Sequence, residues 1–222
     1  MAINNPVIAD ADIIQDTAVA IQEKDHGGKM EFPDIPSRIR ALLTQDNTVL
    51  NSLIDRTIKN LESDVSMVGY GTFAYCRKLC TLILTSATIL GIDAVRACES
   101  LSNVEIPKVN TINSTCFFGN YTLKRIFLRD VTALNGQQIF FNCTRLTTIV
   151  MGKRATLGAV NSFYTAAQII YVQPEDLSWY STATNWSTLY ANNRVKSVEE
   201  LSGDDLLWYQ EQLAKYPIEE AS

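Results

Sequence analysis

The side chains best suited to metal binding or nucleophilic chemistry are five cysteines and a single histidine, His26. One histidine nearly excludes His-based catalysis and multi-histidine metal sites. Cys76 and Cys80 stand close in sequence, but a structural zinc site needs four convergent ligands, and no other Cys or His spacing supplies them. An odd number of cysteines also argues against a closed disulfide framework. We therefore expect reduced structural thiols and no metal site.

Other short motifs do not complete a catalytic site. Gly69-Tyr70-Gly71 lacks the rest of a phosphate-binding loop, and Asp204-Asp205 is placed like the acidic start of a helix rather than an acid–base pair. No GxSxG, HExxH or P-loop motif occurs in the sequence. Trp179, Tyr180 and Trp186 could stack on a sugar, but the favoured interpretation is that they cover the end of an apolar core. We expect a non-enzymatic protein with no catalytic residue and no cofactor.

Composition limits the classes of partner. The 222 residues are 46% hydrophobic and 19% charged, which allows a sizeable core and excludes global disorder. A net charge of −5 argues against a nucleic-acid binder that works through a basic surface. No stretch approaches the roughly 20 apolar residues that cross a bilayer, and residues 1–16 lack the features of a secretory signal. We expect no nucleic-acid partner and no membrane insertion.

A repeat within residues 65–172 is the strongest pattern in the chain. The motif LxxφxL, in which φ is apolar, begins at Leu79, Leu101, Leu123 and Leu146, and a truncated copy ends at Val172. The φ positions 82, 104, 126, 149 and 170 are separated by steps of 22, 22, 23 and 21. The φ residue and the last residue lie two apart, so both point inward from a short strand. One unit cannot bury its apolar face, whereas stacked units form a continuous core.

Two further columns of residues accompany the motif. The bulky column is Phe73, Val95, Phe117, Phe140 and Phe163, and the small column is Cys76, Cys98, Asn120 and Cys143. We expect both columns on a short helical turn, with room for only a small side chain at the corner of each coil. Val95 and Asn120 depart from the Phe and Cys of the other units, so their coils are expected to pack less well. Only Cys80 and Cys116, outside the small column, are expected to be exposed.

This repeat resembles a known family. The string VGYGTFAYCRKLCTLIL (68–84) resembles the BspA-type leucine-rich repeat, a bacterial and phage variant of about 23 residues. The string IYVQPEDLSWYSTATNWSTLY (170–190) is similar to that family's terminal cap. The resemblance implies a leucine-rich-repeat solenoid over residues 65–195, with about five coils of one strand each and a helical C-terminal cap.

Residues 1–64 are expected to be helical and to serve attachment or oligomerisation. The candidate oligomerisation residues are Leu43, Leu50, Ile54, Ile58 and Leu61, which follow a helical spacing that reaches to about residue 62. A coiled coil and a helix packed on its own chain both fit this spacing. Residues 13–42 resemble a short segment of phage and prophage tail proteins. That resemblance implies a homo-oligomer, with a trimer favoured, that contacts other virion proteins or a host surface receptor.

Residues 196–222 are expected to form an amphipathic helical tail, which starts near Ser197 or Ser202 and ends before Pro217. The residue after φ in each repeat faces outward and gives the stripe Ile83, Glu105, Phe127, Val150 and Tyr171. Because this candidate interaction stripe is mostly apolar, we expect it to be covered. A partner subunit, another virion protein and the chain's own Leu206–Leu213 segment all fit.

Together these patterns predict an α+β protein with a helical region (1–64), a repeat domain (65–195) and a helical tail (196–222). The function they favour is a structural or interaction protein of a phage or prophage tail or fibre, located in the virion. The alternative is a bacterial cell-surface adhesin of the BspA kind, which would bind a host protein or glycan.

Overall fold

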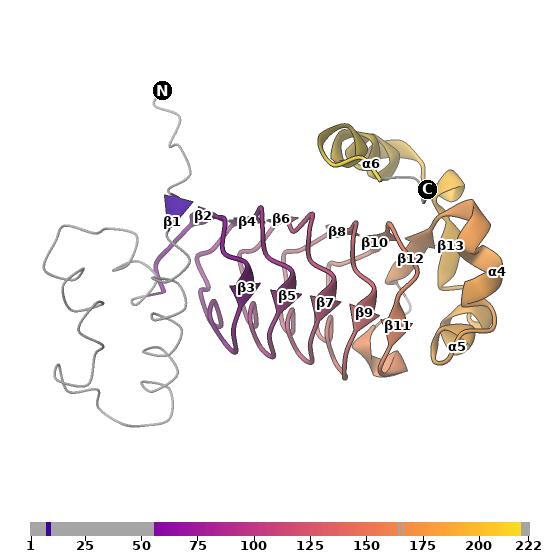
Figure 1. Ribbon diagram of the computed structural model, residues 1–222, viewed down its shortest axis with the longest axis horizontal. Coiled ribbons are helices and arrows are strands. Elements are labelled where there is room, and N and C mark those ends of the chain that lie inside the picture. Colours follow the sequence, from indigo (N-terminus) through magenta and orange to yellow (C-terminus); the bar gives the residue numbers. More distant parts are fainter. Residues whose placement is uncertain (1–7, 10–55, 164, 166, 219–222) are drawn as a thin grey trace, which may run out of the picture.

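The computed structural model describes residues 8–9, 56–163, 165 and 167–218. Its centre is a stack of coils with parallel strands on two sides (Figure 1). One side holds two four-stranded sheets, made of β1 (Ile8–Ala9), β2 (Asn60–Ser63), β4 (Thr81–Leu84) and β6 (Asn103–Glu105), and of β8 (Arg125–Leu128), β10 (Thr148–Met151), β12 (Ile169–Val172) and β13 (Val195–Ser197). The other side is a five-stranded sheet of β3 (Met67–Val68), β5 (Ile89–Leu90), β7 (Thr111–Ile112), β9 (Ala133–Leu134) and β11 (Thr156–Leu157).

The φ positions of the repeat pair with one another in these sheets. Leu82 lies opposite Val104, and Ile149 lies between Ile126 and Ile170. All five side chains are buried, as an inward-facing column requires. The coils differ from the prediction in one respect, because most contain a second strand of two residues. Strands this short carry no period-2 alternation that a sequence pattern would reveal.

The first coil begins earlier than the sequence pattern predicted. Residues 60–63 form β2 instead of the end of a helix, and Leu61 pairs with Leu82. Ile58 and Leu61 are buried at 6% and 1% exposure, so both are core residues and not an oligomerisation face. Within the expected helical region, Ile8 also lies in a strand, opposite Glu62. The other predicted oligomerisation residues, Leu43, Leu50 and Ile54, lie outside the described residues. So does the segment 13–42 that resembles phage tail proteins.

Bulky side chains form a continuous stack through the coils. Phe140 lies between Phe117 and Phe163, with ring centroids 5.4 Å and 5.7 Å away, and all three are buried. Trp186 extends the stack 5.7 Å beyond Phe163 and contacts Tyr180 at 4.8 Å. These stacked aromatic rings add large apolar contacts between neighbouring coils.

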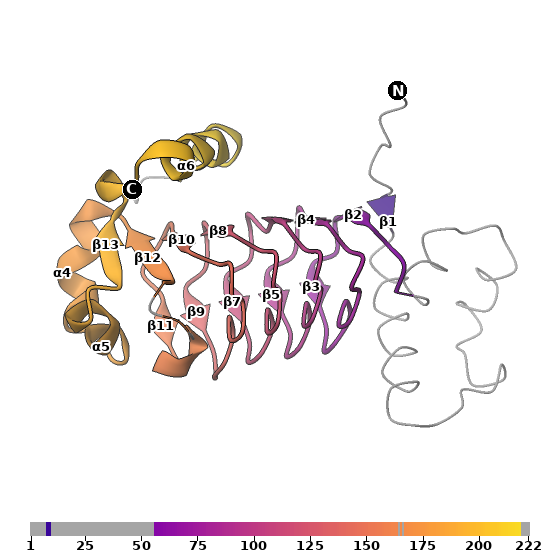
Figure 2. The same cartoon turned by 180° about the vertical axis from the view of Figure 1, so that it is seen from behind.

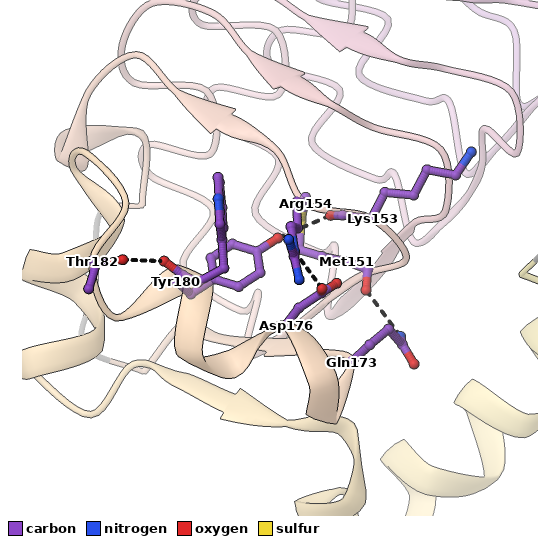
Figure 3. A network of polar contacts seen from close by, with 8 residues as sticks. Met151, Lys153, Arg154, Gln173, Asp176, Tyr180 and Thr182 are labelled. Atoms are coloured by element: carbon purple, nitrogen blue, oxygen red, sulfur yellow. Dashed lines mark hydrogen bonds and ion pairs between the residues drawn. The ribbon is translucent and has the colours of Figure 1, made fainter. Parts of the chain in front are cut away.

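Short helices close the C-terminal end of the stack (Figures 1 and 2). They are η2 (Val160–Ser162), η3 (Pro174–Asp176), α4 (Leu177–Tyr180), α5 (Trp186–Ala191) and η4 (Val198–Glu200). The Tyr180 hydroxyl donates to the Lys153 carbonyl at 3.0 Å, and Arg154 pairs with Asp176 at 2.6 Å (Figure 3). Gln173, which also appears there, donates to the Met151 carbonyl at 3.3 Å.

The capping aromatics are therefore structural. Tyr180 and Trp186 are fully buried, and the Trp186 indole donates to the Ala155 carbonyl at 2.6 Å. Trp179 is partly buried and packs against the same core. A sugar has no access to the two buried rings, which leaves the core-covering interpretation.

The small column binds each coil to the one before it. The thiols of Cys98 and Cys143 donate to the carbonyls of Phe73 and Phe117 at 3.1 Å and 2.9 Å. Gln168 makes the same contact in the last coil, where it donates to the Phe140 carbonyl at 3.2 Å. The polar atom of these side chains matters as much as their small size, because it forms a hydrogen bond with a buried backbone carbonyl.

Three expectations about this column and its surroundings were wrong. Asn120 does not weaken its coil: it is fully buried, donates to the Val95 carbonyl at 3.0 Å and accepts from the Cys98 amide at 2.8 Å. Cys116 is not exposed but fully buried. The corner is also not a helical turn, because Tyr75 and Ala97 adopt positive φ angles of 61° and 54° that no helix accommodates.

Candidate interaction surface

Part of the outward stripe is covered by the chain's own C-terminal helix α6 (Gly203–Lys215), which lies over β8 and β10 (Figures 1 and 2). Phe127 and Val150 are 4% and 0% exposed and form a small separate core with Tyr209 and Leu201. The Phe127 and Tyr209 rings meet edge to face, with centroids 5.7 Å apart. The sequence allowed three possible covers for the stripe. In the structure, the chain's own Leu206–Leu213 segment covers part of it.

Further members of this cluster come from both sides of the contact. They are Tyr171, Val198, Leu206, Trp208, Leu213, Tyr216 and Ile218. Ile83, at the opposite end of the stripe, is half-buried and lies outside the cluster. The helix therefore covers the C-terminal part of the stripe.

Polar contacts fix the first turn of α6 on the sheet. Asp205 accepts from Arg125 Nε at 2.5 Å and from the Thr148 hydroxyl at 2.6 Å. The sequence assigned Asp205 to helix capping, but its carboxylate binds strands β8 and β10 instead. A carboxylate that accepts from a guanidinium and a hydroxyl forms charge-assisted bonds, which are stronger and more directional than neutral ones. Asp205 thus sets the position of the helix along the sheet.

A second polar contact holds the last turn. Glu105, the one charged residue of the stripe, is 8% exposed and accepts from the Tyr216 hydroxyl at 2.7 Å and from Lys215 Nζ. Burial raises the pKa of Glu105, but the hydrogen bonds from Lys215 and Tyr216 and the Lys215 charge lower it by more, so its pKa lies below the ordinary value. Glu105 is therefore held as a carboxylate beneath the end of the helix.

A groove of about 520 Å³ opens beside α6, next to the point where the sheet is interrupted between β6 and β8. Its lining is Ser100, Ser102, Asn103, Val104, Thr122, Lys124, Arg125, Arg145 and Trp208. At the interruption, the Thr122 hydroxyl donates to the carbonyls of Glu99 and Leu101 at 2.8 Å and 2.9 Å. The groove thus combines hydroxyl groups, cationic side chains and one indole.

The positive charge of this groove is only partly neutralised. Arg125 is paired with Asp205, whereas Lys124 and Arg145 are exposed and have no ion-pair partner among the described residues. The sequence pattern did not reveal this site, because Trp208 lies in the C-terminal tail and the cations lie in neighbouring coils. Trp208, Lys124 and Arg145 belong to no column of the repeat, so no periodic signal pointed to them.

The residues considered for chemistry have structural positions. Gly69-Tyr70-Gly71 belongs to a turn in which the Gly71 amide donates to the Ile92 carbonyl of the next coil at 3.0 Å. Burial raises the pKa of the Cys76 and Cys143 thiols to about 12, so neither is a thiolate at neutral pH. In the described part of the chain, no group of three or more His, Cys, Asp or Glu side chains is arranged to hold a metal ion. His26 lies outside the described residues.

No described helix is both long and apolar enough to span a bilayer.

The stacked coils, with their aromatic and small-residue columns, define a repeat protein that buries one core through contacts between neighbours. The chain belongs to the BspA-type leucine-rich repeat family, whose model matches residues 54–176 in six copies, which is more than half of the 222 residues.

The start of the match before residue 60 agrees with β2 as the strand of an additional first coil. No curated protein and no solved structure matches the chain. Membership of this family indicates a role in protein interaction or surface adhesion, and such repeat proteins are typically non-enzymatic.

Proposed function

We propose that this chain is a non-enzymatic interaction protein that acts as a homo-oligomer, with a trimer favoured, in a phage or prophage tail or tail fibre. Family membership supports the interaction role. The resemblance of residues 13–42 to tail-protein segments supports the virion location and contact with other tail proteins. The part of residues 1–64 that precedes the first coil would contribute to attachment, and the coils would provide the projecting surface.

The observation that carries the proposal is an apolar patch on the first coils. Met67 and Ile89, paired neighbours in β3 and β5, are 43% and 36% exposed, and Ile92 is 47% exposed. The same row in later coils holds Thr111, Ala133 and Thr156, which are smaller or more polar. Clustered exposed apolar side chains indicate a contact surface.

The position of the patch favours a second copy of this chain as its occupant. Arg56 lies at the same end of the stack as the patch, with its guanidinium 5.5 Å over the Tyr75 ring. The predicted oligomerisation residues Leu43, Leu50 and Ile54 directly precede this point. A contact between copies would therefore join the patch and the N-terminal region at one end of the molecule.

Mass photometry of the purified chain tests the oligomer. We expect a trimer of the 24.8 kDa chain, and dissociation when Met67→Glu and Ile89→Glu are combined. Thr156→Glu, in the same row but on a distant coil, is the matched control and should leave the mass unchanged. A wild-type monomer at micromolar concentration would overturn the oligomer.

Immunogold electron microscopy tests the location. Gold particles on the tails of phage from a lysate of the strain that carries the gene would support the virion proposal. Labelling of intact bacteria without labelling of phage would instead support the second candidate, a cell-surface adhesin for host protein or glycan. The groove beside Trp208 is the observation that favours this second candidate. Absence of label from both would overturn both candidates.

A further inference from the structure

We propose that the groove between α6 and strands β6 and β8 binds an acidic saccharide, that is, a sugar ring that carries a carboxylate. The inference rests on the binding role proposed above, but it names a ligand and a site of its own. It fits either candidate of the proposed function, because a virion protein in host attachment and a surface adhesin would both meet cell-surface glycans.

Charge selects an anionic ligand. Lys124 and Arg145 line the groove and have no ion-pair partner in the described structure, while Arg125 is already bound to Asp205. A guanidinium matches the planar geometry of a carboxylate, and an ammonium adds a compact second charge. Two unpaired cationic side chains that line one groove suit one carboxylate better than a series of phosphates.

The remaining lining suits the hydroxyl groups and the apolar face of a sugar. Thr122 and Ser102 use their hydroxyl protons on backbone carbonyls, so their oxygens remain free to accept from a ligand. Asn103, whose side chain also hydrogen-bonds Glu105, adds an amide to the lining. Trp208 supplies a half-buried indole, which packs against the C–H face of a ring while its neighbours bind the hydroxyl groups.

The size and walls of the groove favour a saccharide over a peptide. Its volume of about 520 Å³ lies within the roughly 300–1,000 Å³ of small-molecule sites. An extended peptide would need to add a strand at the interruption of the sheet. Cα atoms of β6 and β8 already lie within 8 Å of each other, whereas a strand inserted between them needs about 9.6 Å.

Isothermal titration of the full chain tests the ligand class. The probes are sialyllactose and a uronic-acid tetrasaccharide, which represent two sources of a carboxylated sugar, with lactose and a tetraglutamate peptide as comparisons. We expect one or both acidic sugars to bind and to change the tryptophan fluorescence, and lactose and the peptide to bind at least about tenfold more weakly. The sugar that binds more tightly identifies the source.

Variants locate the site. Combined Lys124→Gln and Arg145→Gln should weaken binding of the sugar by about tenfold or more. Because both side chains are exposed, their loss should leave the fold intact. Lys108→Gln, at an exposed lysine that does not line the groove, is the control outside the site and should bind like wild type.

Four outcomes would overturn the proposal: no binding of either acidic sugar at millimolar concentration, equal binding of lactose, equal binding of tetraglutamate, or equal weakening by Lys108→Gln. If the sugars fail while the virion or cell-surface label is found as expected, the groove assignment falls and the proposed function stands.

Discussion

The Tyr216 hydroxyl donates to Glu105 Oε2 at 2.7 Å and joins the end of α6 to a strand 111 residues earlier. Lys215 binds the same oxygen. Despite its burial, Glu105 has a pKa below the ordinary value because of these donors. A carboxyl whose pKa is lower in the docked state stabilises docking above its undocked pKa, and this contribution is lost as the pH falls through the docked value.

We therefore expect acid to release α6. The contribution of Glu105 should begin to decline near the ordinary glutamate pKa of about 4.3 and disappear below its lowered, docked value. Pulsed hydrogen exchange with mass spectrometry would follow protection of residues 203–215 between neutral pH and pH 3. Glu105→Gln should weaken docking at pH 7 and flatten the acid dependence, whereas Glu99→Gln, in an exposed pair with Arg77, should not. Protection that is constant down to pH 3 would contradict the role of Glu105.

The behaviour of α6 at alkaline pH depends on Tyr216, the hydrogen-bond partner of Glu105. Burial and the hydrogen bond to Glu105 raise the pKa of Tyr216 to about 12. A group whose pKa is raised on docking contributes below its ordinary value, about 10 for tyrosine, and loses that contribution as the pH rises towards 12. We expect α6 to be released in this range, as seen by hydrogen exchange corrected for the intrinsic rate. In Tyr216→Phe this alkaline step should be smaller.

Phe127→Asp should release α6 and leave the coils folded. The substitution places a charge beneath Tyr209, where the ring centroids are now 5.7 Å apart, and a buried unpaired carboxylate is strongly unfavourable. Limited proteolysis should cut within 198–218 and leave the repeat region intact. Ile83→Asp, at the uncovered end of the stripe, is the matched control and should leave cleavage unchanged. Equal resistance of the Phe127→Asp variant and wild type would show that α6 does not depend on this contact.

Phe140→Ala should cost about 3–5 kcal/mol of unfolding free energy, the range for a large core aromatic. Phe140 lies between two stacked rings and is fully buried, so its loss leaves a cavity that rigid neighbouring coils cannot close. Urea denaturation would measure the change. Phe118→Ala, which removes a half-buried ring stacked at 5.4 Å on Phe141 outside the core, should cost less than half as much. Similar values for both would mean that the central stack does not dominate stability.

Sequence spacing predicted the stack because each coil repeats the same packing problem. The φ positions, the Phe column and the buried Cys98 and Cys143 all follow from a period of about 22 residues, and the pairing of Leu82 with Val104 agrees with it. The first coil was missed because Ile58 and Leu61 also fit a helical spacing, and three to four residues cannot separate the two periods. Its strand is decided by pairing with β4, which is a tertiary contact.

The contacts of α6 lay beyond sequence spacing for a different reason. The inward and outward alternation of side chains in the repeat predicted an outward apolar stripe, and the C-terminal tail was one of the segments that could cover it. It did not predict that Asp205 binds Arg125, or that Trp208 meets Lys124 and Arg145 at a groove. These residues are far apart in sequence and belong to no repeat column. Their meeting depends on the angle at which the helix returns over the sheet.

Asn120→Ala should destabilise the stack although it removes few atoms. It leaves the Val95 carbonyl and the Cys98 amide without their partner in a fully buried site, and each such group costs about 1–3 kcal/mol. Asn120→Cys should recover part of the loss, because the thiols of the other coils donate to the equivalent carbonyl. Asn135→Ala, at an exposed position, is the control and should change stability little in thermal unfolding. If the Asn120→Ala and Asn135→Ala variants unfold at the same temperature, the hydrogen bonds of Asn120 between coils contribute nothing to stability.

Cys80 should be the one rapidly labelled thiol of the native protein. It is only partly buried directly before β4, whereas the other four cysteines are buried, Cys116 included. Burial also raises the pKa of all four of these thiols, so they lack both access and thiolate character at pH 8. Titration with a thiol reagent should therefore give one fast equivalent in the native state and five after denaturation. Cys80→Ser should remove the fast phase, and fast labelling of Cys98 or Cys143 would contradict their place at the coil corners.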